Sequence, residues 1–180
     1  GEEEAGHGQR WRQRVGPAPH DAPPSDEAVG KMGIAEAVAV LRAHMTVARV
    51  AIMACCRLVN LCAEDGGRQR AVAAEALEAA VEALRAHPQS TAVQELGCWV
   101  LVNVCSGSDA VGAACRQRAV GAKALEAAVE AMRLHPQTVC VQEMGCRVLD
   151  NVSYGSDAAA AARRQRAVGA KALGAAVDAL

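Results

Sequence analysis

The sequence predicts an all-α protein made of stacked helical repeats, and three observations support this fold class. The first is a segment that recurs every 48 residues. The second is the placement of apolar residues three and four apart inside each copy, which is the spacing of one helix face. The third is the 41 alanines among 180 residues, because alanine is the strongest helix former. One such unit cannot bury its own apolar face but stacked units can, so the sequence predicts a solenoid.

The repeat is marked by the sequence RQRAV, which occurs at 68–72, 116–120 and 164–168. Residues 68–115 and 116–163 are identical at 33 of 48 positions without a gap. An earlier copy aligns at an offset of 43, because its connecting loop at 63–67 is five residues shorter than 106–115. We therefore expect copies at 25–67, 68–115 and 116–163, and a partial copy at 164–180.

The two ends of the chain differ from the repeats. Residues 1–24 are rich in Gly, Pro and charge with little to bury, which predicts a disordered segment or linker. The chain starts at Gly1 without a methionine and stops at Leu180 inside an element that earlier copies complete. We expect a piece of a longer protein, truncated at both ends.

Three helices can be assigned to each copy, most clearly at 116–163. The first includes 116–122 and is entered from Ser108-Asp109, where Asp109 is a good N-cap. The second spans 124–135 and ends before Pro136, because proline disfavours helical conformation in the preceding residue. The third spans about 138–153. The apolar stripes of the second and third helices are Leu125, Ala128, Val129 and Met132, and Val141, Gly145, Val148, Leu149 and Val152.

Composition restricts the classes of partner. The formal net charge is −1, whereas nucleic-acid or anionic-membrane binding needs a basic excess. No apolar run reaches the roughly 18–20 residues of a membrane span. The eight cysteines include no CxxC pair, so we interpret them as reduced thiols in the core of a cytoplasmic or nuclear protein, and we expect no metal and no disulfide.

No catalytic motif is recognisable: there is no phosphate-binding glycine loop, GxSxG elbow, HExxH or kinase set. Three histidines, His44, His87 and His135, recur from copy to copy. Each ends a second helix, where a histidine complements the negative end of the helix dipole. We interpret them as structural.

The residues of the second and third helices resemble the armadillo repeat. The second helix ends in LRAHP and the third contains VQELGCWVLVNV, with a small residue followed by Trp-x-x-x-Asn at Gly97, Trp99 and Asn103. The pattern is similar to the armadillo regions of leucine-rich-repeat kinases and of other armadillo repeat proteins, and it covers about residues 25–180. The resemblance implies a right-handed superhelical solenoid of three-helix repeats whose third helices line a concave groove.

The resemblance also implies a binding site in that groove. In peptide-binding members, groove asparagines hold the backbone of an extended peptide and tryptophans form side-chain slots. The tryptophan is matched at Trp99 but is Cys56 or Arg147 in the other copies, which disfavours a receptor for basic import signals. The asparagine is matched in every complete copy. The predicted groove residues are Trp99, Asn103, Arg147, Asn151 and Asn60.

Two alternatives stay open for these residues. Trp99 and Asn103 are four apart on one helix face, opposite the apolar stripe, so we expect Trp99 in the groove as a binding anchor. It can instead pack against the neighbouring repeat. The asparagines can likewise brace the turn into the next repeat and hold no partner.

We expect a non-catalytic scaffold that needs no cofactor and binds a partner protein or an extended peptide. One alternative is the repeat region of a larger multidomain kinase or GTPase, whose catalytic domain lies outside these residues. Another is a purely structural array, in which groove substitutions change stability only.

Overall fold

The structure is a computed structural model that describes residues 22–170, and every element in this part of the chain is helical. Parts of the predicted linker (1–21) and of the partial fourth copy (171–180) lie outside the described residues. The helices are α1 (Asp26–Gly30), α2 (Ile34–Ala43), α3 (Ala48–Cys62), α4 (Gly67–Ala73), α5 (Ala76–Ala86), α6 (Thr91–Cys105), α7 (Ala110–Gly121), α8 (Ala124–Leu134), α9 (Val139–Ser153) and α10 (Ala158–Gly169).

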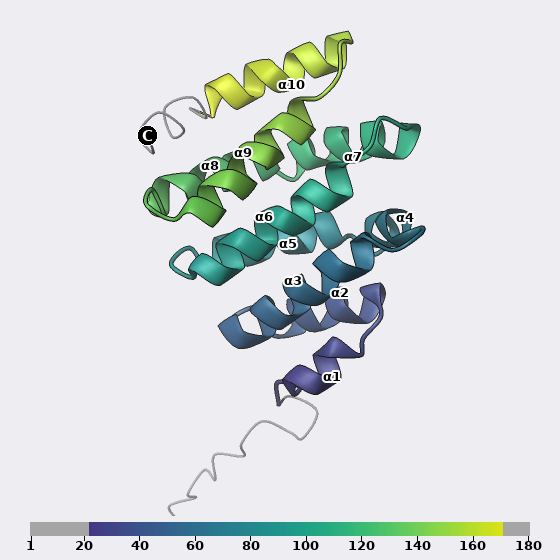
Figure 1. Cartoon of the computed structure of the whole chain (residues 1–180), viewed down its shortest axis with the longest axis vertical. Coiled ribbons are helices and arrows are strands. Elements are labelled where there is room, and N and C mark those ends of the chain that lie inside the picture. Colours follow the sequence, from purple (N-terminus) through teal and green to yellow (C-terminus); the bar gives the residue numbers. More distant parts are fainter. Residues whose placement is uncertain (1–21, 171–180) are drawn as a thin grey trace, which may run out of the picture.

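The helices form three successive units, α1–α3, α4–α6 and α7–α9, which stack along the long axis of the molecule and are followed by α10 (Figure 1). Within each unit the second helix packs on the third. Between units, the third helices α3, α6 and α9 pack side by side, and the second helices α2, α5 and α8 also contact one another in order. The prediction of an all-α protein of stacked helical units is confirmed.

The predicted helix boundaries agree with the structure to within one or two residues at 124–153. The second helix, α8, ends at Leu134 and the third helix, α9, begins at Val139. The predicted N-cap is confirmed, because Asp109 Oδ1 accepts a hydrogen bond from the amide of Gly112 at 2.8 Å at the start of α7. Local capping and proline signals therefore fix these helix ends.

The five residues that separate the 43-residue and 48-residue spacings lengthen a helix. The first helix of the second unit, α4, has 7 residues, whereas its equivalent α7 has 12. The segment 106–115, aligned as a connecting loop, therefore contributes its second half to α7. The additional helical turn carries the N-terminus of α7 beyond the position at which α4 begins.

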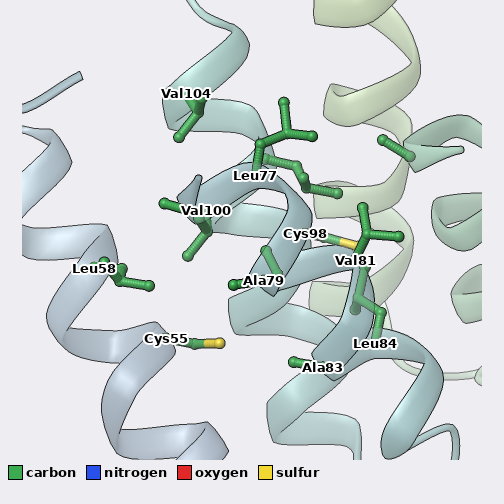
Figure 2. Packing of buried hydrophobic residues seen from close by; sticks show 14 of the residues in the cluster. Cys55, Leu58, Leu77, Ala79, Val81, Ala83, Leu84, Cys98, Val100 and Val104 are labelled. Carbon is green, nitrogen blue, oxygen red and sulfur yellow. The ribbon is translucent and has the colours of Figure 1, made fainter. Parts of the chain in front are cut away.

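Small and branched residues fill the core between the units. Cys55 and Leu58 of α3, Leu77 and Leu84 of α5, and Val100 of α6 pack together and are almost fully buried (Figure 2). Second and third helices approach closely where the third helix has glycine. A Cβ added to Gly97 would lie 2.8 Å from Leu84 Cδ2, so the backbone of α6 sits directly against that side chain.

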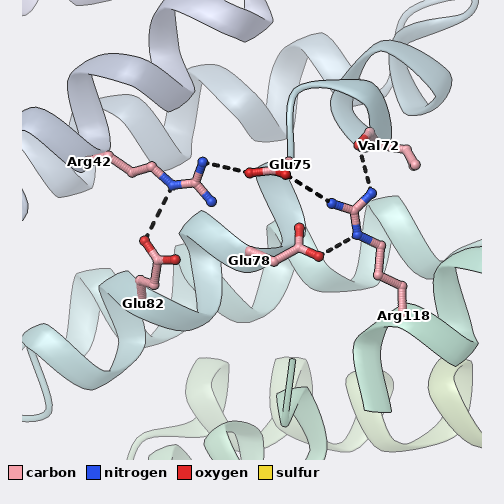
Figure 3. A network of polar contacts seen from close by, with 6 residues as sticks. All are labelled: Arg42, Val72, Glu75, Glu78, Glu82 and Arg118. Carbon is pink, nitrogen blue, oxygen red and sulfur yellow. Dashed lines mark hydrogen bonds and ion pairs between the residues drawn. The ribbon is translucent and has the colours of Figure 1, made fainter. Parts of the chain in front are cut away.

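Ion pairs connect the units on the side of the second helices. Glu75 lies between two arginines, 2.9 Å from Arg42 of the first unit and 3.7 Å from Arg118 of the third. The pair between Arg118 and α5 recurs one repeat later between Arg166 and Glu126, at 2.7 Å. Exposed pairs stabilise little singly, and pairs that share residues in a network contribute more. Figure 3 shows the network of Arg42, Val72, Glu75, Glu78, Glu82 and Arg118.

Candidate functional site

A stripe of exposed and half-buried residues runs along each third helix, and we call the three stripes together the third-helix face. The stripes occupy equivalent positions four residues apart, and none of their residues is buried. Because α3, α6 and α9 lie side by side, the stripes form one surface. The face consists of Ala48, Ile52, Cys56 and Asn60 on α3, Thr91, Glu95, Trp99 and Asn103 on α6, and Val139, Glu143, Arg147 and Asn151 on α9. The structure therefore brings all five predicted groove residues onto this face.

Trp99 is on the central helix of the face and is 38% exposed. It is one of four large apolar side chains exposed within residues 22–170, with Val139 at 79%, Tyr154 at 54% and Val168 at 59%. Trp99 and Val139 are on the third-helix face, and Tyr154 is the C-cap of α9. Three of the four thus lie on or beside the third helices.

The asparagines brace neighbouring third helices. Asn103 Nδ2 donates to the carbonyl oxygen of Val59 at 3.2 Å, and Asn151 Nδ2 donates to that of Val102 at 3.0 Å. These carbonyls belong to the last turns of α3 and α6, where carbonyl groups lack a partner within the helix. Asn60 is exposed and donates to no residue of the described part. The amide nitrogens of Asn103 and Asn151 thus bind within the protein, as the alternative of a structural brace expects. That their amide oxygens contact a partner stays a prediction.

Arg147 adds charge to the face without a firm partner. Its Nη1 atom is 3.8 Å from Glu143 Oε1, and both side chains are more than half exposed. Exposed pairs at this spacing stabilise a helix by only ~0.3–0.5 kcal/mol. The guanidinium is therefore available to a ligand at little cost.

Two of the three recurring histidines bind to the preceding unit. His87 Nε2 is 2.7 Å from the carbonyl oxygen of Met45, and His135 Nε2 is 2.8 Å from that of Pro88. Each histidine is the C-cap of its second helix. Their side chains join consecutive units, in agreement with the structural interpretation.

The cysteines are free thiols in three different environments. Burial raises the pKa of Cys55 and of Cys98 to about 12, so both are neutral core residues at the packed side of α3 and α6. The equivalent Cys146 is exposed, because no third helix follows α9 within residues 22–170. The core interpretation is confirmed for the five buried cysteines, Cys55, Cys62, Cys98, Cys105 and Cys115, and is wrong for Cys146.

One polar feature beside the face was not predicted from the sequence. A cavity of about 280 Å³ lies where the C-terminal end of α9 meets the loop before α7. It is next to the third-helix face, because Asn151 borders both. Arg116, the first arginine of the RQRAV segment, is 95% buried in its wall. The cavity is lined by Cys105, Gly107, Ser108, Arg116, Asn151 and Tyr154.

Comparisons with protein-family models, with curated proteins and with solved structures find no match for this chain. None of the helices at residues 22–170 combines the length and apolarity that crossing a bilayer requires. Arguments about function therefore depend on the geometry of the third-helix face and its surroundings.

Proposed function

We propose that this chain is a non-catalytic binding module, an armadillo-type solenoid whose third-helix face holds a partner protein or an extended peptide. The observation that carries the proposal is the exposure of Trp99 at the centre of the face formed by α3, α6 and α9. Tryptophan is the side chain most enriched among residues that dominate binding energies. Val139 on the neighbouring helix supplies further apolar surface.

Polar groups around Trp99 suit a polypeptide ligand. Asn103 and Asn151 use their amide nitrogens within the protein, so each presents its amide oxygen as an acceptor for a backbone N–H of the ligand. Glu95, Glu143 and Arg147 place both signs of charge on the same face. A near-neutral face with an aromatic centre favours a partner with apolar side chains and mixed charge over a polyanion.

The test measures affinity and stability on the same variants. Peptides are selected against the chain from a displayed library, and the dissociation constant of an enriched peptide is measured for the wild type and for Trp99→Ala. Loss of a true anchor weakens binding by more than ~1 kcal/mol, which is about fivefold or more. Val168→Ala is the matched control, because Val168 is exposed on α10 and is not one of the residues of the third-helix face, and it should leave affinity unchanged.

Melting temperature separates anchor from core. A residue that only packs against its neighbours would lower the melting temperature on substitution and leave the affinity of the folded fraction unchanged. If Trp99→Ala lowers the melting temperature and leaves the affinity unchanged, the third-helix face is not the binding site.

A further inference from the structure

Arg116 is a buried charge without a counterion in the described part of the chain. Its Nη1 atom donates to the carbonyl oxygen of Gly107 at 2.6 Å, and its Nε atom is buried with no hydrogen-bond partner. No ion pair within residues 22–170 includes it. The equally buried Arg163 is also in no ion pair within these residues, but it donates to two carbonyl oxygens, at 2.7 and 2.9 Å, one of them from its Nε atom. Buried charges are normally paired, because an unpaired one loses solvation without compensation.

The preceding repeat shows what this arginine position binds. Arg68, which aligns with Arg116, forms an ion pair with the carboxylate of Asp109 in the next loop. The equivalent loop residue for Arg116 is Asp157, which caps α10 through Ala160 as Asp109 caps α7 through Gly112, but which forms no ion pair within residues 22–170. The guanidinium of Arg116 lies instead over the ring of Tyr154, 5.2 Å from its centroid. A ring face attracts the cation but accepts none of its in-plane N–H groups.

The cavity beside this guanidinium has the size and polarity of a site for one side chain. Its volume of about 280 Å³ is below the range of sites for drug-sized ligands. Ser108 and Asn151 add polar groups to its wall. Cys105 does not supply a negative charge, since burial raises the pKa of its thiol to about 12. The cavity therefore combines an unpaired cation with neutral polar groups, and none of its lining residues supplies an anion.

We propose that this cavity binds a carboxylate, contributed by an aspartate or glutamate side chain of the partner on the third-helix face. A carboxylate accepts two parallel N–H groups of a guanidinium and takes the place that Asp109 has beside Arg68. We assign the carboxylate to the partner chain because Asn151 borders both the cavity and the third-helix face. This assignment rests on the proposed function. Binding of a carboxylate as such does not rest on it.

The first experiment needs no partner. The Nε resonance of Arg116 in the isotope-labelled wild-type chain is identified by its loss in Arg116→Lys and is followed during titration with sodium acetate at constant ionic strength. We expect a saturable shift. The matched control is the Nε resonance of Arg164, the exposed arginine that makes the same contact one repeat later, to the carbonyl oxygen of Gly155 at 2.8 Å, and it should shift only linearly. A linear response of Arg116 would overturn the proposal.

Two further arms identify a competing anion. The titration is repeated with inorganic phosphate. If the shift of the Arg116 resonance saturates at a lower phosphate than acetate concentration, the site prefers a phosphate group and the proposal is overturned. Asp157→Asn tests an internal counterion. If that variant moves the Arg116 resonance and strengthens acetate binding, Asp157 already occupies the site in solution and the proposal is wrong.

The last arm connects the cavity to the partner. Peptides selected through Trp99 should carry an acidic residue, and its change to Gln should weaken binding to the wild type about tenfold, in the range of a charge-assisted pair. The same change should have no effect on binding to Arg116→Gln, which lacks the charge that pairs with the carboxylate. An equal loss with both proteins would refute the partner assignment while leaving acetate binding intact. Failure of the proposed function would give a different result: the enriched peptides would bind wild type and Trp99→Ala with the same affinity.

Discussion

Replacing Asn103 by alanine tests the brace between third helices. The substitution removes the hydrogen bond from Nδ2 to the carbonyl oxygen of Val59, which spans 3.2 Å between α6 and α3. A neutral hydrogen bond contributes about 1 kcal/mol net to stability. The hydrogen bond is only partly buried and Asn103 is half-buried. Water can therefore replace the lost donor at the Val59 carbonyl, and the larger free-energy cost of a fully buried carbonyl without a partner does not apply. We expect a loss near 1 kcal/mol from the bond alone.

Helix propensity opposes this loss, and the chain offers a control that cancels it. Alanine is favoured over asparagine by up to about 0.7 kcal/mol in a helix interior. Asn60 occupies the equivalent position on α3, is exposed, and donates to no described residue. Asn60→Ala therefore gains helix propensity and loses no hydrogen bond to a neighbouring helix. The informative quantity is the difference between the two variants, for which we expect Asn103→Ala to be less stable by about 1 kcal/mol.

Urea denaturation followed by far-ultraviolet circular dichroism measures this difference, with unchanged slopes as the sign that both variants lose the same structure. For a chain of this size, the difference corresponds to a melting temperature lower by about 2–4 °C. Equal stabilities of Asn60→Ala and Asn103→Ala would show that the contact between α6 and α3 contributes nothing. The bracing role of the asparagines would then be abandoned.

Further predictions concern packing and the thiols. Gly97→Ala should cost about 1–3 kcal/mol in urea denaturation, because its Cβ would lie 2.8 Å from Leu84 Cδ2, whereas Gly121→Ala, with no atom within 4 Å, should not destabilise; equal effects would contradict the close approach of α5 and α6. In the native protein a thiol reagent should modify exposed Cys146 and not buried Cys98; rapid modification of Cys98 would contradict its burial. Burial raises the pKa of Cys98 from 9.0 to about 12, so its full contribution to stability is present below pH 9 and is lost as pH rises from 9 towards 12, when the unfolded thiol ionises first. Denaturation at pH 8 and pH 10 should therefore show a smaller decline in Cys98→Ala than in the wild type, and an equal decline would be inconsistent with the raised pKa.

Repetition in the sequence was sufficient to predict the helical units, because each copy carries its own local signals. Asp109 accepts an amide hydrogen bond at the start of α7, and the proline after the second helix marks its end. The apolar stripe of the second helix, from Leu125 to Met132, is buried as expected. These features depend on neighbours three or four residues apart, which a single sequence displays directly.

Contacts between units were less predictable, since they depend on side-chain direction and on what lies beyond each helix. The bonds from Asn103 and Asn151 to the preceding third helix require the spacing of stacked helices. The exposure of Cys146 follows from the lack of a described neighbour beyond α9, although its own sequence context repeats that of Cys98. Burial of Arg116 depends on the ring of Tyr154, which occupies the place of Ser106 one repeat earlier.

Hydrogen exchange of the chain with and without a selected peptide tests the central claim most directly, because it locates the bound surface without assuming which residues form it. Protection on binding should appear in α6 and α9, which carry Trp99, Asn103, Arg147 and Asn151. The second helices α5 and α8 should exchange at the same rate in both states. Protection confined to α5 and α8, with α6 and α9 unchanged, would contradict the assignment of the third-helix face as the binding surface.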